Sequence, residues 1–346
     1  ASCHRVEQNF TIELVQGRGE NPYPIFFTHP RETLTYHYER NPADPRVGHS
    51  LTLAVDAFGN VLREAAVGYG RRQPDAELAA ADQAKQAQRH LIYTEHGFTN
   101  AITDPDDYRT PSPCESRTYD LTGLALPPGR ARFTFDEVVI AGAAATAIPF
   151  EQTAPAGLLR KRLIEHGRSL YRRNDLSAAL PQGQQESLAL TFEQYQLAFT
   201  PESLTAAYGT RVSAAMMQPE GGYVHLAGDA NWWMPSGRAL LSPDAADTTA
   251  QELVYARQHF YLPHRYRDPF HTALVSTESF VRYDAYDLLI EETRDAAGNR
   301  VTAGERDAAG NLTVAGNHYR VLKPALVMDP NGNRQAVAFD ALAAGQ

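Results

Sequence analysis

The first part of the chain alternates apolar and polar positions and therefore predicts β-strands. The alternation runs in patches through residues 6–15, and residues 33–38 are rich in β-branched and aromatic side chains. Residues 51–55 alternate with period two and then meet the turn-forming residues 56–60. Because successive side chains of a strand point to opposite faces of a sheet, this pattern predicts strand, turn, strand. Residues 41–45, Asn-Pro-Ala-Asp-Pro, predict another turn, since each proline disfavours helix for the residue before it.

Other segments break this alternation and predict helices or connectors. Residues 75–89 are rich in Ala, Glu, Gln and Lys and predict a short helix or an ordered loop. Residues 156–173 space Leu159, Leu163, His166 and Leu170 as one face of a helix. Further helices are expected from Pro201 and within residues 244–255, and the small residues 141–147 predict a connector. The sequence thus indicates a mainly β fold with helical insertions around residues 75–90, 156–173 and 201–255, and with strands again from residue 273 onward.

A short motif, Asp-x-x-Gly-Asn, recurs between strand-like runs. Its Asp can accept a hydrogen bond from a nearby backbone amide, its Gly adopts positive φ without a Cβ clash, and its Asn tolerates positive φ better than most residues. A chain that reads strand, motif, strand therefore folds into antiparallel hairpins. The last three copies begin 12 and 22 residues apart, close to the length of one hairpin or two. The Asp, Gly and Asn of the four copies are Asp56, Gly59 and Asn60; Asp295, Gly298 and Asn299; Asp307, Gly310 and Asn311; and Asp329, Gly332 and Asn333.

Composition and charge narrow the classes of protein. Hydrophobic residues make up 43% of the 346 residues, which is enough for a sizeable core and argues against wholesale disorder. The formal net charge of -9 disfavours nucleic acid and anionic membranes as partners, since both need a basic surface. The start at Ala1, without Met or signal peptide, indicates a piece of a longer protein. The two cysteines, Cys3 and Cys114, could form one disulfide or remain two thiols.

Paired Tyr-Asp steps precede the clustered motifs and carry a family resemblance. The steps lie at Tyr283, Asp284, Tyr286 and Asp287. Next to Asp-x-x-Gly-Asn turns they resemble the RHS/YD repeats of large secreted bacterial proteins. Longer strings resemble the middle region of the B component of ABC-type bacterial insecticidal toxin complexes, at residues 27–33, 36–46, 51–69, 108–121 and 260–270. The chain departs from the turn pattern after Asp268, where His271 and Thr272 stand in place of Gly-Asn.

The resemblance implies a fold, an organisation and a role. RHS/YD repeats wind a β-sheet into a hollow shell, so the chain is expected to be a curved antiparallel β-sheet of hairpins that forms part of such a shell. The implied segments are a mostly β region over residues 1–147, a mixed segment with helical insertions over 148–272, and RHS/YD-type hairpins over 273–346. The implied role is structural: the shell encapsulates a cytotoxic polypeptide for delivery into host cells.

The same resemblance implies the partners and the location. The partners would be the remainder of the B component, the RHS-repeat C component with its enclosed toxin and, indirectly, the A-component channel. Neither nucleic acid nor direct membrane insertion is expected. The complex would be synthesised in the bacterial cytoplasm and act outside the cell. The alternative from another class is a secreted carbohydrate-binding or adhesin-like β-module.

Two residue sets could indicate a metal site, and both are incomplete. His259, His264 and His271 are separated by four and six residues, a spacing that fits no helical i,i+4 pair. Asp329, Asn331, Asn333 and Asp340 match four ligand positions of a 12-residue calcium-binding loop of the EF-hand type. Arg334, however, stands at the position where that loop needs Gly. We therefore expect no bound metal and no cofactor.

Candidate catalytic groups are equally incomplete. Glu291 and Glu292 could pair as in a glycosidase, but neighbouring strand residues point to opposite faces. Cys114 lies among prolines, and no partner base can be identified for it. We therefore expect no enzymatic activity.

Two further groups of residues have structural interpretations. The basic run Arg160-Lys161-Arg162, with Arg168, Arg172 and Arg173, is expected to be a solvated helix face or a contact to an acidic surface of the shell. Trp232 and Trp233 are expected to plug a core or line an inner wall. In the alternative carbohydrate-binding function they would be the platform on which a sugar stacks.

The turn chemistry makes a prediction about substitution. Gly298, Gly310 and Gly332 should have positive φ, and Gly310→Val should lower the free energy of unfolding by about 1 kcal/mol or more through the steric cost of a left-handed residue. Urea denaturation of the two proteins measures this difference. Glycines found within helices, or at negative φ within strands, would contradict the prediction.

Strand-like sequence at both ends predicts open sheet edges. Residues 5–15 and 335–339 both read as strands, and an edge strand exposes a row of unpaired amides and carbonyls that pair with other chains. The isolated chain should therefore self-associate, or its end strands should exchange amide protons rapidly. Size-exclusion chromatography with light scattering and hydrogen exchange test this. A strict monomer whose end strands are as protected as its central ones would contradict it.

Overall fold

The computed structural model describes residues 4–38, 43–307 and 309–340. Within these residues the chain is mainly β, and it divides into two compact units. Unit 1 comprises Ala1–Arg168, Gln196–Ser213 and His225–Trp233, and unit 2 comprises Ser169–Tyr195, Ala214–Val224 and Met234–Gln346. The sequence analysis instead placed its segment boundaries after residues 147 and 272.

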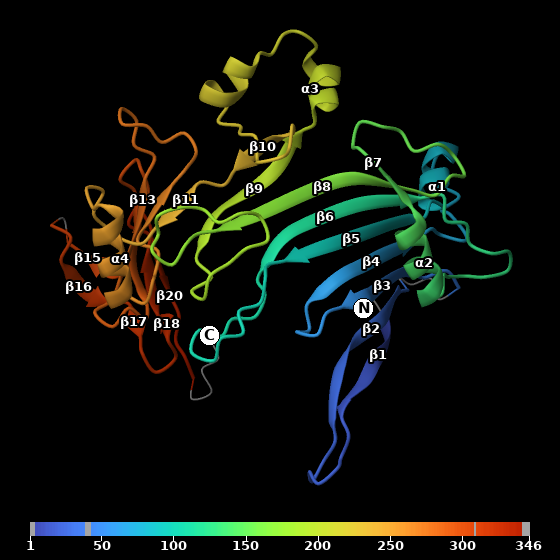
Figure 1. The fold of residues 1–346 in the computed structure, drawn as a ribbon, viewed down its shortest axis with the longest axis horizontal. Helices are drawn as coiled ribbons and strands as arrows, with labels where there is room; N and C mark the ends of the chain where they lie inside the picture. Colours follow the sequence, from blue (N-terminus) through green and yellow to red (C-terminus); the bar gives the residue numbers. More distant parts are fainter. Residues whose placement is uncertain (1–3, 39–42, 308, 341–346) are drawn as a thin grey trace. The chain divides into compact units, whose positions relative to one another are not determined.

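Ten strands of the described residues form one large sheet. Their hydrogen-bonded order is β1-β2-β3-β4-β5-β6-β8-β9-β10, with β7 paired to β8. Neighbours from β1 to β6, and β6 with β8, run antiparallel, whereas β7 is parallel to β8. Figure 1 shows β3 to β6 and β8 lying side by side. The bounds are β1 His4–Gln16, β2 Ile25–His37, β3 Arg46–Val55, β4 Val61–Tyr69, β5 His90–Phe98, β6 Pro113–Thr122, β7 Thr146–Ile148, β8 Arg160–Tyr171, β9 Thr191–Phe199 and β10 Trp232–Pro235.

The register of unit 1 aligns residues of like burial in rows across its strands. One row faces the core and consists of Leu51, Ala65, Tyr93, Tyr119 and the partly buried Leu163, each opposite the next. The adjacent row is more exposed and consists of Ser50, Ala66, Ile92, Asp120 and Arg162. Because side chains alternate between faces, a one-residue slip of any strand would exchange these rows. The predicted alternation of residues 51–55 is therefore the local part of a pattern that runs across five strands.

A helix covers the core row, where the sequence analysis expected only a connector over residues 141–147. Helix α2, Phe135–Ala144, begins with a capping box in which Thr134 accepts from the Glu137 amide. Its residues Val138 and Ala141 are buried against the sheet. At Gly142 a Cβ atom would lie 2.3 Å from Cε2 of Tyr93. Small residues stand in this stretch because the helix backbone approaches the tyrosine ring, so the connector prediction was wrong.

The helix predicted over residues 156–173 was also wrong, because most of that segment is strand β8. The cross-strand pairs are Tyr119 with Leu163 and Thr118 with Glu165, so Ile164 is an extra residue that forms a β-bulge. Leu163 and His166 therefore lie on the same face although they are three residues apart. That spacing imitates one face of a helix, which explains the misinterpretation.

The basic residues lie on β8 or just after it, not on a helix, and all but Arg160 contact carboxylates of the same chain. Lys161 Nζ lies 2.6 Å from Glu95 Oε1, and Arg162 lies 3.6 Å from Asp120. Glu115 accepts from Arg168 Nε at 2.9 Å and contacts His166 Nε2 at 2.8 Å. In unit 2, Arg172 lies 4.0 Å from Glu252 and Arg173 lies 4.0 Å from Glu186. The carboxylates that the basic residues contact are thus in the same chain.

The remaining helices agree in position with the expected insertions. Residues 75–89 contain α1, Ala80–Gln86, and α3 begins at the expected proline, as Pro201–Tyr208. The helix expected within residues 244–255 lies slightly later, as α4, Thr249–Gln258, because Thr248 caps it. A π-helical turn, Met216–Glu220, follows α3. Within the described residues no helix is long and apolar enough to cross a membrane.

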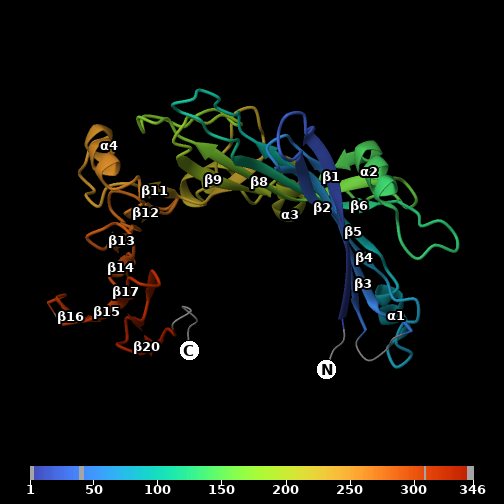
Figure 2. The ribbon, with the colours of Figure 1, turned by 90° about the horizontal axis from the view of Figure 1, so that it is seen from below.

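Unit 2 holds a second, smaller antiparallel sheet. Its order in the described residues is β11-β12-β13-β14-β15-β19-β20, with β16 paired to β15, and β17 pairs with β18 separately. Figure 2 shows β11 to β15 following one another, with α4 beside β11. The bounds are β11 Arg238–Leu240, β12 Arg265–Arg267, β13 Ser279–Tyr283, β14 Ile290–Arg294, β15 Arg300–Arg306, β16 Leu312–Ala315, β17 Asn317–His318, β18 Lys323–Pro324, β19 Leu326–Met328 and β20 Arg334–Ala336.

Strand β1 lies at an edge of the large sheet and is unusually exposed. Strand β3 pairs only with Glu32–His37 of β2, so the outer part of the β1–β2 hairpin pairs with itself alone; Figure 1 shows it beyond the end of β3. Three apolar side chains of β1, Phe10, Ile12 and Leu14, are 53%, 66% and 61% exposed. These features fit the open edge expected from the sequence.

The Glu115 cluster predicts acid sensitivity. Burial alone would raise the pKa of Glu115, but hydrogen bonds from His166 and Arg168 outweigh it and lower the pKa to about 2. Because this value lies below that of the unfolded chain, the stabilisation is present above about pH 5 and is lost as the pH falls toward 2. Glu115→Gln should therefore lower the free energy of unfolding by up to about 3 kcal/mol at neutral pH and by little near pH 2.

Urea denaturation across this pH range measures the difference between the two proteins. Glu165→Gln is the matched control, since Glu165 lies on the adjacent strand β8 and is exposed. An equal loss of stability at neutral and acid pH in Glu115→Gln would contradict the prediction.

Candidate functional site

The four Asp-x-x-Gly-Asn copies form one turn geometry. In the first copy, Asp56 Oδ1 accepts from the amides of Phe58 and Asn60, both at 2.9 Å, and Oδ2 accepts from Asn60 Nδ2 at 3.0 Å. Asp295, Asp307 and Asp329 accept from the backbone amide and side-chain amide of their own Asn in the same way. The values of φ are 89° at Gly59, 88° at Gly298, 85° at Gly310 and 80° at Gly332, so the glycines have the sign that the motif predicts.

The same hydrogen bonds occupy the carboxylate oxygens of the aspartates and lower their pKa values. In the last three copies the Asn side-chain amide is the foremost cause that lowers the pKa of the aspartate. Both oxygens of Asp329 are occupied by amides of Asn331 and Asn333. Three of the four residues matched to a calcium loop, Asp329, Asn331 and Asn333, therefore serve the hairpin turn.

The Tyr-Asp segment forms a fifth turn of this kind, which the sequence analysis did not recognise. Asp284 is 4% exposed, and its Oδ1 accepts from the amides of Tyr286 at 3.1 Å and Leu288 at 2.9 Å. The Asp287 amide donates to the Asp284 carbonyl at 3.1 Å, as Gly59 does to Asp56. Asp287 thus occupies the glycine position, and its φ is 56°. The missing Gly hid this turn from a motif search.

The two tyrosines of the segment have different environments. Tyr283 ends β13, and its hydroxyl donates to the Pro263 carbonyl at 3.2 Å. Tyr286 is 67% exposed and meets the ring of Tyr319 edge-on, with centroids 5.8 Å apart. The first tyrosine therefore ties the turn to the segment before β12, and the second lies on the surface.

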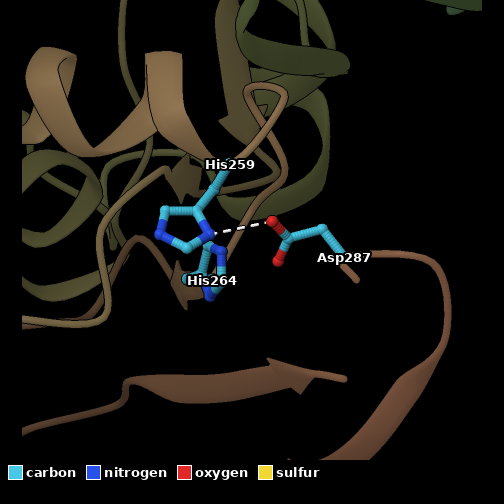
Figure 3. Close-up of side chains that lie close together, drawn as sticks. All are labelled: His259, His264 and Asp287. Atoms are coloured by element: carbon cyan, nitrogen blue, oxygen red, sulfur yellow. Dashed lines mark hydrogen bonds and ion pairs between the residues drawn. The ribbon is translucent and has the colours of Figure 1, made fainter. Parts of the chain in front are cut away.

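Asp287 faces two of the three histidines that the sequence analysis singled out. His259 Nδ1 and Asp287 Oδ2 are 2.9 Å apart, and the rings of His259 and His264 meet edge-on with centroids 5.7 Å apart. Figure 3 shows the three side chains pointing toward one another. These two histidines are no helical i,i+4 pair; they meet because His259 is the C-cap of α4 and His264 lies just before β12.

The third histidine lies in a remodelled loop. Asp268 Oδ1 accepts from the Phe270 amide at 2.8 Å and from the Thr277 hydroxyl at 2.7 Å. His271 Nδ1 accepts from the Thr277 amide at 3.2 Å. The departure from Gly-Asn at this point thus gives a loop closed by Thr277 in place of a tight turn.

The backbone around His264 is fixed on both sides. Its amide donates to the Leu240 carbonyl at 2.9 Å, and its carbonyl accepts from the Val281 amide at 2.8 Å. The next residue, Arg265, is 3% exposed and lies 2.6 Å from Glu278. These contacts hold the His264 ring against Tyr283.

Burial defines the electrostatics of the cluster. Burial of His264, assisted by the neighbouring His259, lowers its pKa, so the imidazole is neutral near pH 7. Burial and the Asp287 charge raise the pKa of Tyr255, whose ring stacks on His259 with centroids 4.0 Å apart. The cluster thus combines a neutral imidazole, a carboxylate–imidazole pair and aromatic walls.

The other candidate residues lie elsewhere. Trp233 is 0% and Trp232 is 7% exposed; Trp233 contacts His166 and the Arg168 guanidinium, so neither ring offers an open face to a sugar. Cys114 is buried in β6. Cys3, Asn41 and Pro42 lie outside the described residues.

The two adjacent glutamates do not point apart as expected. Glu291 is the bulged residue of β14, since Arg282 pairs with Glu292 and Tyr283 with Ile290. Arg282 therefore lies 3.4 Å from Glu291 and 3.6 Å from Glu292, and Arg306 contacts both as well. The expectation of opposite faces was wrong, and the arginines neutralise the pair.

Comparison with known proteins gives a sequence match over the first part of the chain and a fold match over nearly all of it. Two solved structures are similar: one described as TcdB2-TccC3-Cdc42 and one of the Photorhabdus luminescens Tc holotoxin pore with a mutation in TccC3. Each has a TM-score of 0.58 and 19% identity, and covers 99% of this chain. This chain spans only 15% of the length of those chains. None of the curated proteins compared with it matches.

The sequence match covers the first third of the chain. Residues 4–110 match the family model described as the insecticide toxin TcdB middle/C-terminal region. They contain β1 to β5 and so the first strands of the large sheet. The likeness of this chain to insecticide toxin TcdB middle/C-terminal regions is thus shown in sequence for residues 4–110, and in fold for nearly the whole chain.

Proposed function

We propose that this chain builds part of the wall of a toxin-complex B component, a β-shell that encapsulates a cytotoxic polypeptide for delivery into host cells. The observation that carries the proposal is the two-faced sheet of unit 1. One row of side chains is buried beneath α2, and the adjacent row is more exposed across the same strands. The match to the TcdB family and the fold shared with the TcdB2-TccC3 structure support it.

A sheet of this kind suits a wall for a physical reason. Its interior strands pair all their backbone groups with neighbours, so the surface offers few free amides or carbonyls to a foreign chain. Its open face holds a shallow groove of about 400 Å³ lined largely by small side chains, among them Thr33, Ser50, Thr52, Ala66 and Thr94. Such a face gives an unfolded polypeptide little apolar surface to bind. It can therefore enclose a cargo without trapping it.

The proposed partners follow from the same role. They are the remainder of the B component, the RHS-repeat C component with its enclosed toxin and, indirectly, the A-component channel. The hairpins of unit 2 would be the RHS/YD-type part of the wall. We propose a structural role without catalysis, and a place of action outside the bacterium as part of the assembled complex.

Photo-crosslinking in the assembled complex tests the orientation of the wall. A photoreactive residue at Ala66, on the open face of β4, should crosslink to the enclosed polypeptide. The matched control is Ile140, which is 67% exposed on α2, at the covered face of the sheet, and should give no crosslink to the cargo.

The result also tests the role itself. Protease treatment of the complex should leave the enclosed polypeptide intact. Cargo crosslinks from Ile140, the absence of cargo crosslinks from Ala66, or failure of the chain's parent protein to assemble with a C component would each contradict the proposal.

A further inference from the structure

Three potential metal ligands converge where α4 ends. Within the described part of the chain, His259, His264 and Asp287 each offer one ligand atom, and these atoms lie within 4.8 Å of one another (Figure 3). We propose that they bind a divalent transition metal of the zinc class through two imidazole nitrogens and one carboxylate oxygen. Zn²⁺ accepts this combination of ligands in proteins. The site is independent of the wall-building role.

A buried imidazole nitrogen without a partner is the second observation. His264 is 5% exposed, and its Nε2 has no hydrogen-bond partner within the described residues. Buried polar atoms are nearly always satisfied, so such an atom needs an explanation. The aromatic rings of Tyr255 and Tyr283 meet His264 edge-on and offer it no acceptor or donor in the plane of its ring. A metal ion supplies the missing interaction.

The backbone is strained at the residues that bring the ligands together. Asp287 has a φ of 56° at the position that Gly fills in the four other turns of this kind. Phe260 and Tyr261, directly after His259, have φ of 53° and 56°. Non-glycine residues rarely adopt this conformation, and they persist where the surroundings require it. Here the strained residues hold the Asp287 carboxylate within hydrogen-bond distance of the His259 ring.

The distances define what a metal would change. Tetrahedral zinc with bonds of about 2.0–2.1 Å places its ligand atoms about 3.3 Å apart, so the cluster would have to contract. His264 is held by the Leu240 and Val281 backbones. The movement therefore falls to His259, at the end of a helix, and to Asp287, on a turn. The ion would replace the proton between His259 Nδ1 and Asp287 Oδ2, which are 2.9 Å apart. A fourth position would remain for water or another ligand.

Zinc titration of the chain, stripped of metal with EDTA and dialysed, tests the site. Calorimetry with ZnCl₂ should show one ion bound per chain. CoCl₂ should give the visible absorption of a low-symmetry Co²⁺ site with imidazole ligands. Asp287→Gly restores the usual glycine of the turn, so it should preserve folding and yet weaken zinc binding on the order of 100-fold. His259→Gln should weaken binding to a similar extent, on the order of 100-fold.

The control is His271→Gln, which removes a nearby histidine outside the cluster and should bind zinc as the unchanged protein does. Circular dichroism of each variant establishes that it is folded. The proposal is overturned if the unchanged chain binds no stoichiometric zinc. It is equally overturned if folded Asp287→Gly and His259→Gln proteins bind zinc as tightly as the His271→Gln control, since the ion would then lie elsewhere.

Discussion

The register of the antiparallel ladder in unit 1 is the constraint on which the rest of that unit depends. It places Leu51, Ala65, Tyr93 and Tyr119 in one row, so that four strands bury their side chains on the same face. Burial of each large apolar side chain contributes roughly 1.5–3 kcal/mol. The close approach of Gly142 to Tyr93 adds a steric constraint on this register. A shift of β5 would remove the tyrosine ring on which α2 packs. Helix and register therefore stabilise one another.

Two of the bulges in the antiparallel ladders, one in each sheet, gather charge. At Ile164 the extra residue of β8 brings Leu163 and His166 to the same face, and Arg168 follows toward Glu115. At Glu291 the extra residue of β14 brings two carboxylates to the same arginines. A bulge changes which face the following residues occupy. The chain uses this change to pair ions beside or within a sheet that would otherwise continue an apolar row.

The sequence predicted what local chemistry determines and missed what tertiary contacts determine. The motif glycines, the strands around residues 33–38 and 51–55, and the helix start at Pro201 follow from local preferences. Strand β8 was misread because a bulge gives strand residues a helical spacing. Helix α2 was missed although Thr134 and Glu137 form a capping box, because its small residues carry no amphipathic pattern. The approach of His259 to Asp287, 28 residues away, depends on how α4 packs and has no local signal.

The turn of Asp284–Leu288 differs from the four regular copies in the contacts that stabilise it. In the four regular copies the Asn side chain donates to the second oxygen of the Asp, and Gly accepts positive φ, so each turn is stable without outside contacts. In the altered copy, the Leu288 backbone amide still donates to Asp284, but Leu288 has no side-chain amide for the second oxygen, and Asp287 bears the cost of a left-handed backbone. The interaction of Asp287 with His259 offsets part of that cost. The conformation of this turn is therefore tied to the end of α4, whereas the regular turns depend only on their own residues. A turn held in this way responds to whatever binds its carboxylate, and in that respect it differs physically from the regular turns of the same sheet.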